Sequence, residues 1–440
     1  MTSLVAVRTA LKATDSEHAA LFTSLLDNGK LVPYKSKDSV RRKLGLTEAD
    51  YPSLGKKQAP VVVRNPPSLE ELRDICARDF PEAREYFGGR LIYLTKSGSA
   101  SEIDATEETA GMWTINNLTN ADAAPNSSIV TFPSEGLDEL CDQGYVPPEN
   151  VIHEAMTTSL ILPRSTLLPL HHSNEGTTVT TVLSGSVIWT IWPSTNRNLR
   201  FLQTAYENYA ETWDESRLDI AGHLEGGMAF VQTERDGLRI PPFCIMLCLS
   251  TTTSVLATYS HVTIKEFLSM LQKLPFLRAW FPTEVDGTRK QADFNASFLR
   301  YLDLMLNDDA EEEDEDKSKL KLPEGPLLKQ LLNTWDKVKD DLAAMMGPAH
   351  CEATKNIWEA YLISAKGRQC RICNKRIDNK QKLMRKHFVE KHWVTAKVSK
   401  RVDSMEAMGG EDFAENMVEE NEEGIMEVVE GVEDMELDEC

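Results

Sequence analysis

The stretch that decides the fold is Leu170-His171-His172-Ser173-Asn174-Glu175-Gly176, which continues over residues 177–192 as TTVTTVLSGSVIWTIW. The run 177–183 is rich in Val and Thr, and the run 187–192 is β-branched and aromatic, so both are typical of strands. Ser184-Gly185-Ser186 between them is typical of a turn. The pattern therefore predicts a β-hairpin.

Further strands and helices are expected on both sides of this stretch. Ser68 and Glu71 form a capping box that predicts the start of a helix at residue 69. More strands are predicted at Met228–Gln232, Leu238–Ile240, Ile245–Leu249 and Ser254–Tyr259, and helices at Thr263–Leu274, Ser297–Leu306 and Pro326–Met346. The expected fold class is α+β, with an antiparallel jelly-roll core and flanking helices.

Composition and charge divide the chain into segments. The net charge of −21 comes mainly from 308–316, where eight of nine residues are acidic, and from 403–440, which has sixteen acidic residues and no Lys or Arg. The segments expected are an N-terminal region 1–64, a barrel region with flanking helices 65–306 (core about 152–260), an acidic linker 307–320, a helical segment 321–365, a zinc finger 366–396, and a basic stub with a disordered acidic tail 397–440.

The barrel region resembles the JmjC branch of the cupin superfamily. The resemblance rests on residues 170–177, on the turn and strand 183–193, on Leu224-Glu225-Gly226-Gly227 and on Ile240-Pro241-Pro242-Phe243-Cys244-Ile245-Met246. It implies a double-stranded β-helix and the chemistry of protein lysine demethylases and hydroxylases. Those proteins hold Fe(II) with a His-x-Asp/Glu pair and a distant His, and they bind 2-oxoglutarate with a Lys. Together with a finger, the barrel is similar to fungal JmjC-like proteins.

Three of the four positions that the resemblance assigns carry unsuitable residues. His172 matches the first iron ligand, but Asn174 stands at the carboxylate position and Met246 at the distal His position. Val187 stands at the Lys position and cannot pair with a carboxylate. Since Fe(II) prefers imidazole and carboxylate ligands, we expect neither Fe²⁺ nor 2-oxoglutarate to bind, and we assign no catalytic residue.

Alternatives for the barrel site remain open. A shift of register by one residue would make His171 the ligand, and Glu175, His223 or His261 would serve as replacement ligands in a rearranged Fe(II)/2-oxoglutarate oxygenase. Otherwise the two adjacent histidines are an ordinary polar pair at the end of a strand.

A second set of residues has the spacing of a zinc site. Two residues separate Cys370 from Cys373, thirteen lead to His387, and four more lead to His392. In a Cys-Cys-His-His finger, a knuckle supplies two thiolates and a helix two imidazoles to tetrahedral Zn²⁺. Lys382–Lys391 is predicted to be that helix, and Ile377 and Leu383 to form its small core. The alternative is a helical hairpin with surface histidines.

The residues around the finger are basic. Lys366–Arg401 holds thirteen basic and two acidic residues, and Lys380, Lys382, Arg385 and Lys386 are candidate contacts to DNA or RNA phosphates. One finger reads only about three base pairs. A solvated surface or a contact with the acidic tail are the alternatives.

Compartment and partners follow from the remaining features. The eight scattered cysteines and the absence of a long apolar run predict a soluble intracellular protein that does not enter membranes. The basic cluster 397–401 is typical of a nuclear import signal. Protein partners are expected through the barrel and the acidic tail, and the tail's alternative role is to keep the chain in solution. The function expected is that of a nuclear, chromatin-associated or nucleic-acid-binding regulator with an inactive barrel.

Overall fold

The computed structural model describes residues 4–14, 16, 18–33, 37–55, 68–86, 93–94, 100–101, 115, 129–141, 151–284, 287–306, 325–364, 369–377 and 381–393. The predicted acidic linker and acidic tail, and Lys380, lie outside the described residues. The chain divides into two compact units, with the boundary between Gln291 and Ala292. In the described part of the chain, no helix combines the length and the apolar character needed to cross a bilayer.

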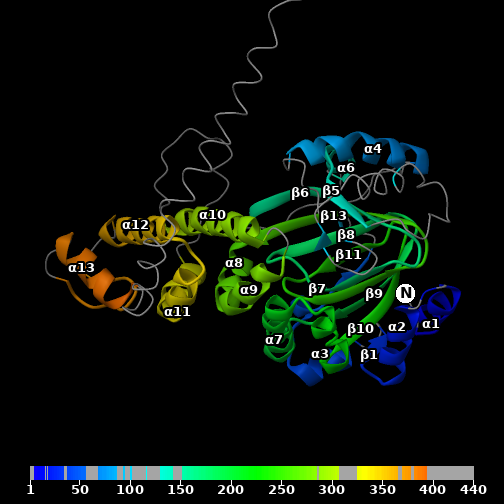
Figure 1. The fold of residues 1–440 in the computed structure, drawn as a ribbon. Helices are drawn as coiled ribbons and strands as arrows, with labels where there is room; N and C mark the ends of the chain where they lie inside the picture. Colours follow the sequence, from blue (N-terminus) through cyan, green and yellow to red (C-terminus); the bar gives the residue numbers. More distant parts are fainter. Residues whose placement is uncertain are drawn as a thin grey trace, which may run out of the picture. The chain divides into compact units, whose positions relative to one another are not determined.

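The first unit is built on two largely antiparallel sheets (Figure 1). One has five strands in the order β1-β10-β9-β12-β7, and the other has six in the order β2-β11-β8-β13-β6-β5; only the β1–β10 pair is parallel. The strands are β1 Leu31–Pro33, β2 Ser53–Leu54, β5 Val130–Pro133, β6 Val151–Leu162, β7 Leu167–His172, β8 Thr177–Ser184, β9 Ser186–Trp192, β10 Gly227–Thr233, β11 Gly237–Ile240, β12 Ile245–Ser250 and β13 Ser254–Thr263; β3 Tyr93–Leu94 and β4 Ala100–Ser101 form a separate pair. The four strands predicted beyond the first two runs are confirmed as β10 to β13.

The two sheets share one apolar core. Val187, Trp189 and Ile191 of β9 lie in it, as do Met246 and Cys248 of β12, together with residues of β6, β8, β11 and β13 from the other sheet. Every second residue of β9 and β12 faces this core, as the period of 2 in a strand requires, and the residues between them are buried as well, because both faces of this sheet are covered. The described residues thus form a mixed α+β fold, in agreement with the predicted fold class at this level.

The prediction of a β-hairpin over residues 177–192 is wrong. Both strands are present, but β8 pairs with β11 and β13, whereas β9 pairs with β10 and β12 in the other sheet. Gly185, at φ +88°, turns the chain from one sheet to the other, and a Cβ there would lie 2.5 Å from the carbonyl oxygen of Thr253. A corner between sheets requires the same glycine turn and the same β-rich flanks as a hairpin, so the local pattern cannot separate the two.

Helices cover the outside of this unit. The predicted capping box is present: the backbone N–H of Ser68 donates to Glu71 Oε2 (2.6 Å) and that of Glu71 to Ser68 Oγ (3.2 Å), and α4 begins at the next residue. The predicted helix 263–274 is interrupted by a 3₁₀ turn. The helices are α1 Leu4–Ala13, α2 His18–Asp27, α3 Lys37–Leu44, α4 Leu69–Tyr86, α6 Glu135–Cys141, α7 Asn196–Thr212, α8 Ile264–Met270 and α9 Leu274–Trp280, with 3₁₀ turns at Glu48–Asp50, Glu215–Leu218, Ala221–His223, Leu271–Lys273 and Phe281–Thr283.

The second unit is helical. Helix α10 spans Gly287–Leu306 and crosses the boundary between the units, so it is longer than the predicted helix. Helix α11 spans Pro326–Ala343, α12 spans Pro348–Ser364 and α13 spans Lys382–Lys391. The bounds of α13 are those predicted, and α11 begins where predicted and ends three residues earlier. Helix α12 is not in the predicted set.

Candidate metal centre

Cys370 and Cys373 lie on a tight backbone knuckle. An isolated bridge pairs Gln369 with Arg376, and the N–H of Cys370 donates to the carbonyl of Lys375 (2.9 Å). The turn closes when the N–H of Asn374 donates to the carbonyl of Cys370 (2.7 Å). Asn374 has φ +61°, a left-handed conformation that Asn adopts more readily than most residues. The sequence between the cysteines therefore folds so that one turn presents both thiols.

Helix α13 supplies one imidazole, and the residue that follows it supplies the other. Met384, His387 and Phe388 are buried and lie on one face at helical spacing, and His392 directly follows the helix, with its N–H donating to the carbonyl of Phe388 (2.7 Å). Of the two residues predicted to form the small core of the finger, one is buried. Ile377 is buried, but Leu383 is 44% exposed, because the face that carries His387 turns Met384 inward in its place.

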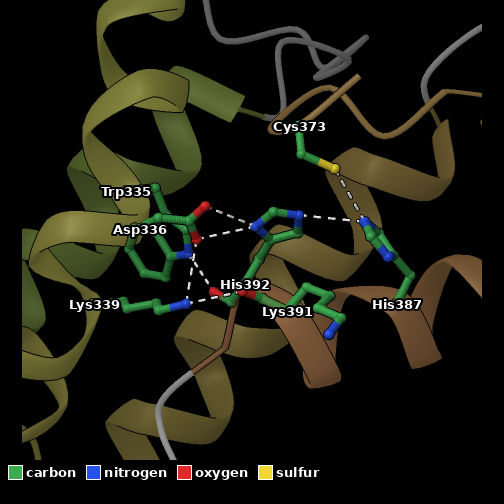
Figure 2. A network of polar contacts seen from close by, with 7 residues as sticks. All are labelled: Trp335, Asp336, Lys339, Cys373, His387, Lys391 and His392. Carbon is green, nitrogen blue, oxygen red and sulfur yellow. Dashed lines mark hydrogen bonds and ion pairs between the residues drawn. The ribbon is translucent and has the colours of Figure 1, made fainter. Parts of the chain in front are cut away.

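The four predicted ligands come together, and Figure 2 shows three of them, Cys373, His387 and His392. The donor atoms of Cys370, Cys373, His387 and His392 all lie within 4.8 Å of one another. Cys373 Sγ is 3.2 Å from His387 Nε2, and the Nε2 atoms of the two histidines are 3.3 Å apart. Two imidazole ligands of a tetrahedral ion with bonds of 2.0–2.1 Å are separated by about 3.3 Å. The group can hold a metal such as zinc.

The burial and hydrogen bonds of the donors affect the atoms that a metal would bind. Burial raises the pKa of the Cys370 thiol and lowers the pKa of His387. Nδ1 of His392 lies 3.0 Å from each oxygen of Asp336, so Nδ1–H donates to the carboxylate and Nε2 is the ring nitrogen left for a metal. A metal ion would bind these lone pairs and displace the proton of the thiol.

Neither known protein families nor curated proteins match this chain. The resemblance to JmjC proteins therefore depends on the quoted residues alone.

The structure does not bring the assigned barrel positions together on one face. Strand β12 pairs Met246 with His171 and Ile245 with His172, and a bulge follows between Met246 and Cys248. Residues paired across strands share a face, so His171 lies on the side of Met246, while His172 lies on the opposite side with Ile245. Val187 is buried in the core between the sheets, and Asn174 is exposed after the end of β7.

His172 packs in an aromatic cluster on the outer face of its sheet. Its ring lies 4.8 Å from the Phe276 ring and 4.7 Å from the Trp280 ring, both edge-on, and it stacks on Phe243 at 6.0 Å. Its Nδ1 shares a hydrogen bond with the hydroxyl of Tyr206 (3.0 Å). This environment is that of a neutral core histidine.

The alternative ligands are dispersed. His223 is exposed and stacks on Phe201, and His261 is buried on β13 in the other sheet. Glu175 follows β7, and burial raises the pKa of its carboxyl group. Among the described residues, the one group of three or more His, Cys, Asp or Glu side chains arranged to hold a metal is that of Cys370, Cys373, His387 and His392.

The buried His172 predicts an acid-sensitive first unit. Burial lowers its pKa from 6.5 to about 3, so between these values the unfolded chain binds a proton that the folded chain does not. The free energy of unfolding should therefore fall as the pH drops from 6.5 towards 3, with His172 contributing up to about 1.4 kcal/mol per pH unit. Denaturant unfolding of the unsubstituted chain and of His172→Phe at several pH values checks this. The variant should show the shallower dependence, and equal slopes would contradict the assignment.

Sequence reasoning missed the residues that support His392. Trp335, Asp336 and Lys339 of α11 all hydrogen-bond to His392 or to its neighbour Lys391 (Figure 2). The buried residues Leu331, Trp335, Val338 and Leu342 mark the apolar face of α11, but nothing in the sequence connects Asp336 to a residue 56 positions away.

Proposed function

We propose that this chain is a non-catalytic nuclear regulator that contacts nucleic acid through a zinc-stabilised finger, with a JmjC-like jelly roll as its scaffold. The observation that carries the proposal is the convergence of two thiols and two imidazoles at tetrahedral spacing. Four protein ligands leave no coordination position for a substrate, which is typical of structural and not of catalytic zinc.

The finger has a basic surface that supports contact with phosphates. Lys382, Arg385 and Lys386 are exposed on α13, away from the buried Met384 and Phe388. Arg385 is 3.3 Å from the largely buried carboxylate of Glu359, whereas Lys386 is 3.8 Å from the exposed Glu390, so Lys386 offers a more available charge than Arg385. Such surface pairs are weak and exchange readily for phosphate contacts.

Salt dependence of binding tests this role. Zinc-loaded full-length chain should bind a short DNA or RNA duplex, and Lys382→Ala/Lys386→Ala should weaken binding and lower the slope of log K against log salt by about 0.9 for each lost DNA contact. Lys329→Ala/Lys337→Ala, which removes two exposed lysines of α11, is the matched control and should leave the slope unchanged. Binding that is absent, or equally affected by both pairs, would overturn the nucleic-acid proposal.

The scaffold role of the barrel is supported by what its inner face carries. The crossing from β8 to β9 joins two sheets that share one core, as a jelly roll requires, and Val187 and Met246 fill that core with apolar atoms. An Fe(II)/2-oxoglutarate oxygenase needs two imidazoles, a carboxylate and a cation at one place. His171 and Met246 face the same side, and among the described residues His171 belongs to no group of three or more His, Cys, Asp or Glu side chains arranged to hold a metal, so we propose a binding scaffold in preference to the oxygenase.

A further inference from the structure

We propose that Asp336 is a positioning residue for the metal ligand His392, and that metal binding makes α11, α12 and the finger a single metal-dependent folding unit. This inference depends on the proposed zinc site and deepens it. The sequence predicts a separate helical segment and a free-standing finger, whereas here part of the metal's environment comes from a helix that lies before the finger in the chain.

The contact between Asp336 and His392 has the geometry of a carboxylate–histidine–metal triad, in which the carboxylate orients the histidine that binds the metal. Both carboxylate oxygens lie 3.0 Å from Nδ1 of His392, and Nε2 of the same ring faces His387 Nε2 at 3.3 Å (Figure 2). The His392 side chain is only 4% exposed, so its ring has little freedom to turn. A carboxylate on Nδ1–H fixes the tautomer and the ring orientation and makes Nε2 a more basic ligand.

The same helix also holds the backbone at the end of α13. Trp335 Nε1 donates to the carbonyl of His392 (2.7 Å), and Lys339 Nζ donates to that of Lys391 (3.0 Å). The last carbonyl groups of a helix have no hydrogen-bond donor within the helix, and a positive charge near them is favourable. Lys339 is also 3.2 Å from Asp336, which links the two anchoring side chains. Three residues within two turns of α11 thus fix the position of His392.

Aromatic side chains join the interior of the finger to both helices. The Trp358 ring lies 4.6 Å from that of Trp335 and 6.3 Å from that of Phe388. Trp393 packs on Phe388 at 5.8 Å and on Trp335 at 6.3 Å. Since Phe388 is a fully buried residue of α13, the apolar core of the finger continues into α11 and α12.

Zinc affinity of the full-length chain, measured by competition with a chromogenic chelator, tests the positioning role. Asp336→Ala should weaken zinc binding 10- to 100-fold, as expected for loss of an outer-shell carboxylate. Asp336→Asn keeps the shape of the side chain and one hydrogen-bond acceptor but loses the charge, so it should weaken zinc binding less than Asp336→Ala does. If Asp336 served only in packing, Asp336→Asn would bind zinc as tightly as the unsubstituted chain. Asp341→Asn, about 140° around α11, is the matched control and should bind zinc as the unsubstituted chain does.

Hydrogen exchange of the unsubstituted chain tests the shared folding. Removing the metal should raise amide exchange in α11 and α12 as well as in 369–393. Exchange confined to 369–393, or equal zinc affinity in Asp336→Ala and the unsubstituted chain, would overturn the inference and leave the zinc site intact. An unsubstituted chain that binds no zinc would overturn the site and the inference together.

Discussion

Replacing Cys370 with Ala is expected to abolish zinc binding and to unfold the segment from α11 to α13. Cys370 is fully buried, so the variant loses a ligand that solvent cannot replace. Structural zinc sites supply about 10–16 kcal/mol at neutral pH, which exceeds the stability of most domains, and a unit of this size has little other means to stay folded. Elemental analysis of the purified chain together with limited proteolysis measures both effects.

The control for this experiment is another buried cysteine of the second unit. Cys351, on α12, is 8% exposed and is not in the metal group, so Cys351→Ala should retain one zinc per chain. The unsubstituted chain, loaded anaerobically with Fe(II) and desalted, should retain one zinc and no iron. One zinc in Cys370→Ala would refute the ligand set, and retained iron with 2-oxoglutarate turnover would replace the scaffold proposal with the oxygenase.

Trp358→Ala should destabilise the zinc-loaded second unit by about 3–5 kcal/mol. The Trp358 side chain is fully buried between Trp335 and Phe388, so truncation opens a cavity where the two helices meet the finger. Denaturant unfolding followed by far-UV circular dichroism, at constant free zinc, measures the loss.

Trp358→Phe distinguishes packing from hydrogen bonding. The indole N–H of Trp358 meets no hydrogen-bond acceptor among the described residues, so Phe removes a buried orphan donor while keeping an aromatic ring. We expect this variant to lose clearly less stability than Trp358→Ala. Equal losses in the two variants would show that the ring does not pack as described.

Local patterns predicted local structure well. The Ser68 capping box, the strands β10 to β13 and the helix α13 each depend on neighbouring residues, so the sequence alone was sufficient to find them. The four metal ligands were also predictable, because the fixed spacing of a knuckle and a helix turn limits where they lie.

Longer-range features were not predictable from such patterns. A turn such as Ser184-Gly185-Ser186 specifies a change of direction but not the sheet that the chain enters next. Choosing Met384 in place of Leu383 for the core needed the phase of α13, which His387 sets in three dimensions. Asp336 and His392 are 56 residues apart, and no periodicity reports their contact.

The bulge between β7 and β12 affects any attempt to restore an oxygenase site by substitution. Changing Asn174 to Asp and Met246 to His would complete the motif as written, yet His172 would still lie among Phe276, Trp280 and Tyr206 on the opposite side of the sheet. A motif is aligned by counting residues along the chain, whereas successive residues of a strand point to opposite faces of the sheet. One extra residue at a bulge therefore moves the residues that follow it to the other face, although the spacing of the motif is unchanged. Reactivation would therefore have to begin with the backbone, by removing the bulge, before any ligand is introduced.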